Sequence, residues 1–129
     1  MLYTSYIANL RNIPDNENTV FLFVTRWKPK FNINRYKAKS LWYPNLGPSE
    51  TLLTRWKSNE DMKWSEYRKI FLEEANLNKL FIDGLYQVID YLDEGKDVFL
   101  LCYEKEDFNC HRSILREIFE LNNIKCKEY

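Results

Sequence analysis

The sequence lacks the features that mark several common classes of protein. Its 129 residues contain no apolar run close to the roughly 20 residues that a membrane-spanning helix needs, so no membrane association is expected. Lys plus Arg and Asp plus Glu balance at 19 each, so no overall charge predicts a polyanionic partner. Only three Gly and four Pro argue against a loop-dominated fold. What remains is the composition of a single globular domain, residues 1–129.

Groups that titrate near neutral pH are also scarce. There is one histidine, His111, and there are three cysteines, an odd number that does not suit a fully paired disulfide framework. The first residues lack the basic start and the long apolar stretch of a secretion signal. We therefore expect a cytoplasmic protein with free thiols, in which any clustering of Cys and His marks a candidate site.

Short apolar or alternating segments predict strands, and longer segments with a helical period predict helices. The expected strands are residues 2–7, 19–24, 98–103 and 124–129. The expected helices are residues 64–75, 78–92 and 110–122, with a further helix start at 48–53. After the second strand, Pro29, Pro44 and Gly47-Pro48 predict a long irregular crossover. This order predicts an α/β domain with a mainly parallel sheet of about four strands, flanked by helices.

Polar groups follow two of the expected strands. The second strand is followed by Thr25-Arg26, and the third is followed by Cys102-Tyr103-Glu104. Ligands of parallel α/β domains bind outside the carboxyl ends of the strands. We therefore expect these groups to share one edge of the sheet and one site.

The tripeptide Cys110-His111-Arg112 begins the last helix and admits several interpretations. Cys110 and Arg116 satisfy the Cys-x5-Arg spacing of a phosphatase loop, but no glycine lies between them and helical spacing places them on different faces. Adjacent helical residues such as Cys110 and His111 diverge by about 100°, which disfavours a shared metal ion. Neither a metal nor another cofactor is predicted.

A helix N-terminus beside cationic side chains favours an anion site instead. Its N–H groups lower a thiol pKa, so Cys110 is a candidate nucleophile, with His111 as proton carrier and Glu104 orienting it. The expected ligand-binding residues are Arg26, Arg112, Cys102 and Ser113. The same spacing also fits an ordinary core, because Cys110 lies four residues before Ile114 on one helix face. Both interpretations stay open at this point.

The stretch FLLCYEKEDFNCHRSILREIF resembles the signature of the domain of unknown function family 488, a Leu-Leu-Cys-x-Glu strand end followed by Cys-His-Arg. The segments VTRWKPKFN, LGPSETLLTRWK and WSEYRKIFLEE are similar to further parts of that family. The resemblance implies a small cytoplasmic α/β protein and no particular activity. It implies motif positions at Arg26, Cys102, Glu104, Cys110, His111 and Arg112. Many members carry an acid shortly before the arginine, whereas this chain has Val24-Thr25-Arg26, so no general base is expected there.

We therefore predict a pocket for the phosphate of a nucleotide or nucleic acid. The sequence leaves open whether the domain acts on a nucleotide or is a nucleic-acid-binding or protein-interaction module without catalysis. The aromatic and basic residues of segment 26–43 suit either stacking on bases or covering the protein's own sheet. No particular protein partner is predicted.

Overall fold

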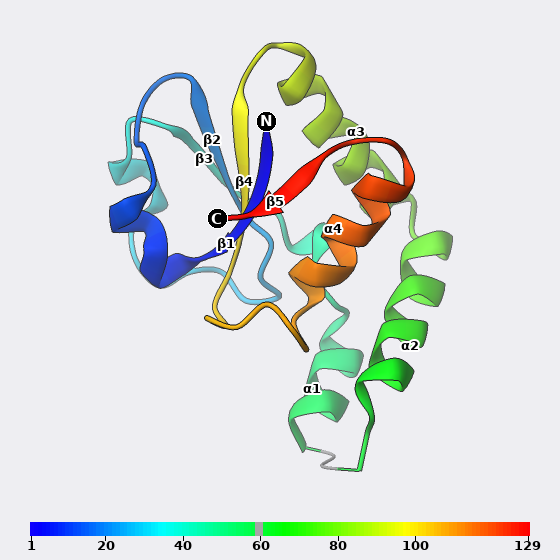
Figure 1. Ribbon diagram of the computed structural model, residues 1–129. Coiled ribbons are helices and arrows are strands. Elements are labelled where there is room, and N and C mark those ends of the chain that lie inside the picture. Colours follow the sequence, from blue (N-terminus) through cyan, green and yellow to red (C-terminus); the bar gives the residue numbers. More distant parts are fainter. Residues whose placement is uncertain (59–60) are drawn as a thin grey trace.

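Within residues 1–58 and 61–129, which the computed structural model describes, five strands form one sheet (Figure 1). The strands are β1 (Leu2–Tyr6), β2 (Thr19–Phe23), β3 (Lys39–Trp42), β4 (Asp97–Cys102) and β5 (Cys126–Glu128). Their order across the sheet is β3-β2-β4-β1-β5, and every pairing is parallel. The predicted α/β class with a mainly parallel sheet is confirmed, with five strands in place of about four.

The additional strand, β3, lies inside the segment that was expected to be irregular. It spans only four residues and pairs with β2, from Val20 opposite Lys39 to Phe23 opposite Trp42. A segment this short shows no readable alternation, so its partner strand decides its conformation by supplying the hydrogen bonds. Tyr43 N continues the pairing by donating to Phe23 O at 2.7 Å.

The expected helices are present, with small shifts at their ends. They are α1 (Glu50–Ser58), α2 (Trp64–Leu77), α3 (Lys79–Asp93) and α4 (His111–Leu121). Three 3-10 segments follow the first three strands: η1 (Ile7–Asn12), η2 (Ile33–Arg35) and η3 (Pro44–Leu46). Ser49 caps α1, because its Oγ accepts from Leu52 N at 3.1 Å. Among the helices described, none combines the length and apolar character needed to cross a bilayer.

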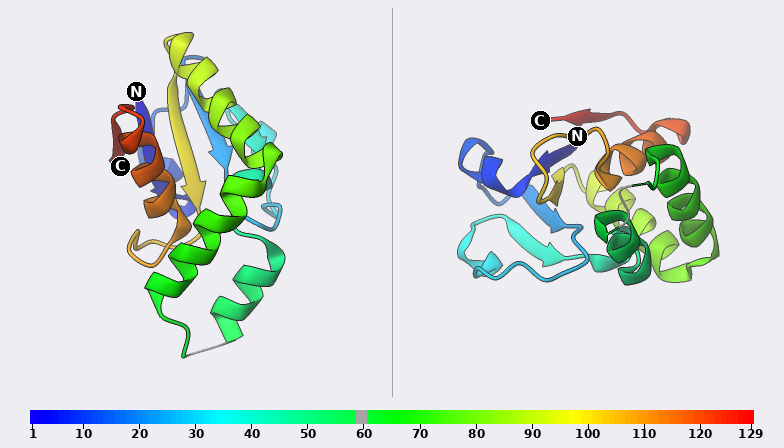
Figure 2. Two further views of the ribbon diagram at one scale, coloured as in Figure 1. Left: turned by 90° about the vertical axis from the view of Figure 1, so that its right-hand side faces the viewer. Right: turned by 90° about the horizontal axis from the view of Figure 1, so that it is seen from below.

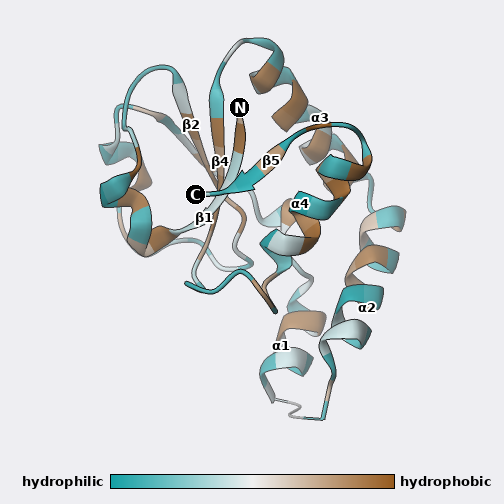
Figure 3. Ribbon diagram, viewed as in Figure 1, coloured by the Kyte–Doolittle hydropathy of each residue, from teal (hydrophilic) through white to brown (hydrophobic). Residues whose placement is uncertain are grey.

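The sheet separates two cores. Helices α1 to α4 cover one face, and η1 and η2 cover the other (Figure 2). Because strand side chains alternate, β2 serves both faces: Val20 and Leu22 pack under the helices, while Phe21 and Phe23 pack under the 3-10 segments. Helices α3 and α4 alternate between hydrophobic and hydrophilic residues along their length, as expected for helices with one buried side (Figure 3).

Candidate functional site

Strands β2 and β4 are neighbours whose continuations go to opposite faces of the sheet. The chain after β2 leads to η2 on one face, and the chain after β4 leads to α4 on the other. Such a divergence opens a crevice outside the carboxyl ends of the strands, where ligands of this fold class bind. The topology therefore places the ends of β2 and β4, near Val24 and Cys102, at the most suitable position for a site.

Cys110 lies just outside α4. Its backbone is extended, with φ −124° and ψ 140°, and the helix begins at His111. The preceding Asn109 has φ 59°, a left-handed conformation that asparagine tolerates. The expected divergence of Cys110 and His111 is therefore wrong, because a rotation of 100° applies only between two helical residues. The two side chains converge with Cys102, and one sulfur or ring nitrogen of each lies within 4.8 Å of the others.

Two thiols and an imidazole are a ligand set that zinc accepts, so the state of the His111 ring matters. His111 Nε2 lies 2.7 Å from Val24 O, and a carbonyl oxygen can only accept a hydrogen bond. Nε2 therefore carries a proton and has no lone pair for a metal. The Cys102 Sγ contact, at 3.4 Å, is also to Nε2. This hydrogen bond removes Nε2 as a metal ligand, and in a neutral ring the lone pair is then on Nδ1.

The surroundings of Cys110 stabilise its thiolate. A hydrogen bond with Cys102 is the main cause that lowers the pKa of Cys110, to about 3, against the opposing effect of burial; the hydrogen bond and charge of His111 and the Arg112 N–H add to it. The Arg112 Nη1 donor also lies 3.6 Å from the sulfur. The two cysteines are unequal, because burial and the hydrogen bond with Cys110 raise the pKa of Cys102 well above its ordinary value.

His111 lies beside Cys110 in this cluster. Burial opposes its charged form, but the hydrogen bond and charge of Cys110 and the Val24 carbonyl raise its pKa on balance. Its ring is also fixed in place, since the centroid of the Phe71 ring lies 6.1 Å away. The site thus combines a Cys110 thiol of lowered pKa with an imidazole of raised pKa, and such a combination favours the thiolate.

Glu104 and Ser113 have other partners than the sequence suggested. Glu104 Oε2 lies 3.6 Å from Cys110 Sγ, and in the described part of the chain it forms no hydrogen bond with His111. A neutral Cys110 would donate to this carboxylate, whereas the thiolate repels it. The Glu104 side chain is exposed, and the donors around Cys110 favour the thiolate. Ser113 Oγ donates to Cys110 O at 2.7 Å, so this hydroxyl is engaged at the helix start.

Arg112 is fully buried, and its donors are used inside the protein. Nε and Nη2 donate to Glu128 at 3.1 and 2.9 Å, Nη2 also donates to Lys105 O at 2.8 Å, and Nη1 donates to Glu104 O. The guanidinium thereby ties the loop after β4 to strand β5. Binding of a ligand anion by Arg112 stays a prediction, and the contacts give it a positioning role.

The Cys-x5-Arg spacing does not form a phosphate loop. Arg116 Nη1 donates to Thr4 Oγ1 at 3.1 Å, and Nη2 donates to Asp107. This hydrogen bond from Arg116 lowers the pKa of Asp107. The Arg116 guanidinium therefore supports the base of the loop after β4 instead of facing Cys110.

Arg26 is the unpaired arginine of the site. The turn that carries it is held by Thr25, whose Oγ1 donates to Trp27 O at 2.6 Å and whose carbonyl accepts from Trp42 Nε1 at 3.0 Å. Within the described residues, the half-buried Arg26 guanidinium has no ion pair and no side-chain hydrogen bond. A partly buried cation without an ion pair at a strand end attracts anionic ligands.

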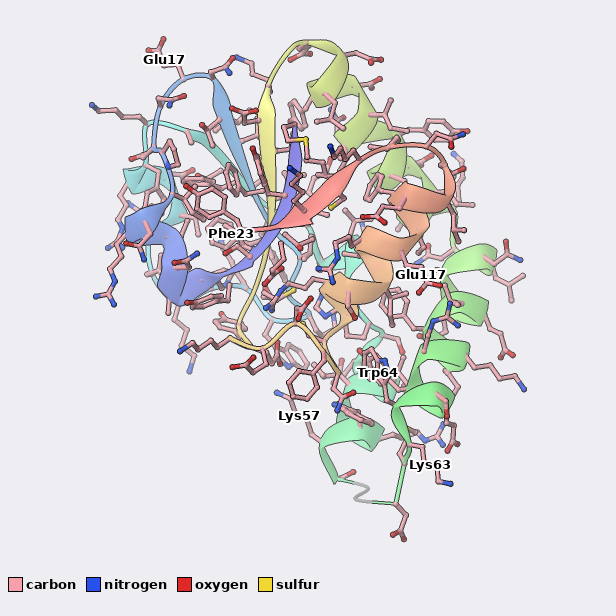
Figure 4. All side chains as sticks on the ribbon, viewed as in Figure 1. Glu17, Phe23, Lys57, Lys63, Trp64 and Glu117 are labelled. Atoms are coloured by element: carbon pink, nitrogen blue, oxygen red, sulfur yellow. The ribbon has the colours of Figure 1, made fainter. Side chains whose placement is uncertain are left out.

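Two small cavities meet at Arg26. One, of about 90 Å³, is also lined by Ser49 and Glu74. The other, of about 40 Å³, is also lined by Glu104, His111 and Lys57. Lys57, labelled in Figure 4, reaches this edge from α1. Sites that enclose a drug-sized ligand measure roughly 300–1,000 Å³, so these cavities suit a single small group rather than a whole nucleotide.

Sequence reasoning did not identify Tyr67, a buried residue of α2, as a neighbour of the site. The residue is buried and its ring stacks on Trp64 with centroids 4.8 Å apart. Burial, then the charges of Cys110 and Cys102, raise the pKa of its hydroxyl, which therefore stays neutral. The helical spacing of Tyr67 reports only that its ring is buried, and it does not show which groups surround the hydroxyl.

Gly47 leaves no space for a side chain next to the site. A Cβ atom there would lie 2.8 Å from Val24 O, the acceptor of the His111 hydrogen bond. We expect Gly47→Ala to reduce the free energy of unfolding by about 1–3 kcal/mol and to shift the His111 ring resonances in NMR spectra. As a control, Gly95→Asn should cost less: it meets no neighbouring atom, and asparagine tolerates the left-handed φ of +82° better than most residues. Unchanged stability and His111 resonances in Gly47→Ala would contradict the close approach.

Comparison with known proteins identifies one relationship. The family model described as the active DUF488-N3 subclade matches residues 5–123, which is nearly the whole chain. Cys102, Cys110, His111 and Arg112 fall inside the match. No curated protein and no solved structure matches the chain.

Proposed function

The chain belongs to the DUF488 family, and within it we propose that this protein is an enzyme that uses Cys110 as a nucleophile. Its substrate carries a phosphate, as a nucleotide or nucleic acid does, and Arg26 binds this phosphate at the carboxyl edge of the sheet. The description of the matched subclade as active agrees with catalysis. A reaction at this edge also agrees with the position of ligands in parallel α/β domains.

The observation that carries the proposal is the set of donors around Cys110. The thiolate receives hydrogen bonds from Cys102, His111 and the Arg112 backbone at the N-terminus of α4. A cysteine that served only as core would not need three polar neighbours, because an apolar environment favours the neutral thiol. The cluster therefore maintains a reactive charge inside the protein, and it does so next to an unpaired arginine.

His111 supplies the proton transfer that a nucleophilic mechanism requires. The proton that leaves Cys110 resides on the imidazole, and the leaving group of the substrate takes it in a later step. Because Nε2 donates to Val24 O, the proton that is exchanged is the one on Nδ1. The Val24 carbonyl thus has a positioning role: it holds the His111 ring in one orientation throughout the catalytic cycle. Glu104, which is exposed, moves away when the substrate approaches Cys110.

The size of the cavities limits which part of the ligand they enclose. Only a phosphate-sized group enters the space beside Arg26, and the rest of the ligand lies on the surface outside. There it passes Tyr103 and Trp27, which are exposed by 50% and 54%. Exposed rings of this kind stack on bases. This arrangement favours a nucleotide or single-stranded nucleic acid over inorganic phosphate alone.

The aromatic and basic segment 26–43 gives less support to a separate binding module. Phe31, Tyr36 and Trp42 pack against the core on the η1 and η2 face of the sheet. Arg35 lies over two of these rings, 5.4 Å from Phe31 and 5.1 Å from Tyr36. Most of the segment therefore covers the sheet, and Trp27 is its exposed ring. We propose no second function from it.

Binding of phosphate tests the role of Arg26. Titration of the protein with AMP and with inorganic phosphate, followed by NMR, should shift the amide signals of Arg26 and His111. In Arg26→Ala the dissociation constant of AMP should rise by about ten- to a hundredfold, the equivalent of one charge-assisted hydrogen-bonded contact. Lys28→Ala is the matched control, because it removes a nearby exposed cation of equal charge. Equal weakening in both variants, or no binding at millimolar AMP, would reject the proposed ligand class.

A further inference from the structure

We propose that Cys102 and Cys110 form a reversible disulfide when the protein meets a peroxide, so that the site contains its own oxidation switch. The inference rests on the proposed function only in that Cys110 is the nucleophile that the disulfide would block. The bond itself requires two neighbouring thiols, and it does not require a substrate.

The positions of the two cysteines carry the proposal. Both are free and buried, and their sulfur atoms lie within 4.8 Å of each other. A disulfide needs an S–S distance of about 2.0 Å, so the sulfurs have to approach by less than about 3 Å. Cys102 is the last residue of β4 and Cys110 is the cap residue before α4. Both therefore lie at element ends, where a small movement leaves the interior hydrogen bonds of strand and helix intact.

The segment between the two cysteines keeps them close together. Residues 103–109 are exposed except for Asp107, and they connect the two cysteines directly. Asn109 has the left-handed φ of 59°, so the chain already turns sharply before Cys110. Arg112 and Arg116 hold this loop through Glu104 O, Lys105 O and Asp107 and keep its ends together. The sulfurs are thus close before any oxidant arrives.

The chemistry divides between the two cysteines. The Cys110 thiolate attacks one peroxide oxygen, the O–O bond breaks, and a sulfenic acid and hydroxide are produced. Cys102 sulfur then attacks the sulfenic sulfur, the S–OH bond breaks, and the S–S bond forms. The hydroxide of the first step takes the proton that Cys110 lost on ionising, and the hydroxide of the second step takes the Cys102 thiol proton, so two waters form. Overall, two thiols are oxidised, and one hydrogen peroxide is reduced to two waters.

The third cysteine provides an internal control. Cys126 is buried in β5, and burial raises the pKa of its thiol to about 12. It is not part of the cluster of Cys102, Cys110 and His111. Cys126 therefore stays in its neutral thiol form and lies outside the pair of neighbouring sulfurs, which makes it a control within the same chain.

The experiment treats the full chain with hydrogen peroxide, blocks the remaining thiols with N-ethylmaleimide and maps the peptides by mass spectrometry without reduction. We expect a Cys102–Cys110 linked peptide in the wild type and in Cys126→Ser, and its loss after dithiothreitol. In Cys102→Ser, we expect Cys110 to proceed to sulfinic and sulfonic acid under conditions in which the wild type stops at the disulfide. The blocking step is carried out in denaturant, so Cys126, which the peroxide leaves as a thiol, should carry maleimide throughout.

Two results would overturn the inference. One is over-oxidation of Cys110 in the wild type at the rate seen in Cys102→Ser, because Cys102 would then not intercept the sulfenic acid. The other is purified protein that retains one zinc per chain on these thiols and forms no disulfide. Neither result depends on AMP binding, so failure of the switch and failure of the proposed ligand class are separate outcomes.

Discussion

Iodoacetamide is expected to alkylate Cys110 nearly as fast at pH 5 as at pH 8. Only the thiolate reacts, and the neighbours of Cys110 lower its pKa to about 3, so the charged form persists until the pH falls towards that value. An ordinary thiol with a pKa of about 8.5 loses roughly a thousandfold in rate over the same interval. The difference between these profiles is the largest effect expected from the site. It is measured by quantifying the alkylated peptide at each pH.

The shape of the profile is the informative quantity, because burial of Cys110 reduces the absolute rate at every pH alike. Cys126 should stay unlabelled across the range, since the pKa of its thiol is raised to about 12. Cys102→Ala should move the inflection of Cys110 to higher pH, as the main stabilising hydrogen bond is removed. An inflection of wild-type Cys110 between pH 8 and 9 would show an ordinary thiol and remove the nucleophile from the proposed function.

Replacing Arg112 by alanine is expected to reduce the free energy of unfolding by about 3–5 kcal/mol, the range for breaking a buried, hydrogen-bonded ion pair. The guanidinium is fully buried and bonds Glu128 and the carbonyls of Glu104 and Lys105. Its removal leaves a cavity, releases the loop after β4 from β5, and takes one donor from the Cys110 thiolate. Urea unfolding followed by circular dichroism measures the change.

Arg68→Ala is the matched control for Arg112→Ala. Arg68 also pairs with a glutamate, Glu117, but both side chains are about 40% exposed, and exposed pairs contribute about 1 kcal/mol or less. A similar small loss in both variants would contradict the structural role given to Arg112. A large loss in Arg112→Ala alone would also explain why this position carries an arginine, even though its donors do not face the crevice.

The amino-acid sequence by itself determined the class of fold and the region of the site. Apolar runs too short for helices, separated by amphipathic helices, admit few arrangements other than a parallel α/β sheet. In such a sheet all carboxyl ends lie at one edge, so the residues after the second and third predicted strands had to be neighbours. Arg26, Cys102 and His111 could therefore be assigned to one region before any coordinates were known.

Only the tertiary structure decided what each of these residues does there. Whether Cys110 precedes or enters the helix depends on one pair of backbone dihedrals, and this choice brings its sulfur to Cys102 and His111. The partner of Arg112, Glu128, comes from a strand whose pairing with β1 is set by the whole sheet. Arg26 is left unpaired because no described acid comes within bonding distance. Local sequence sets strand and helix through short-range sterics and periodicity, whereas charge pairing and thiol contact depend on distances across the fold, which the sequence does not display.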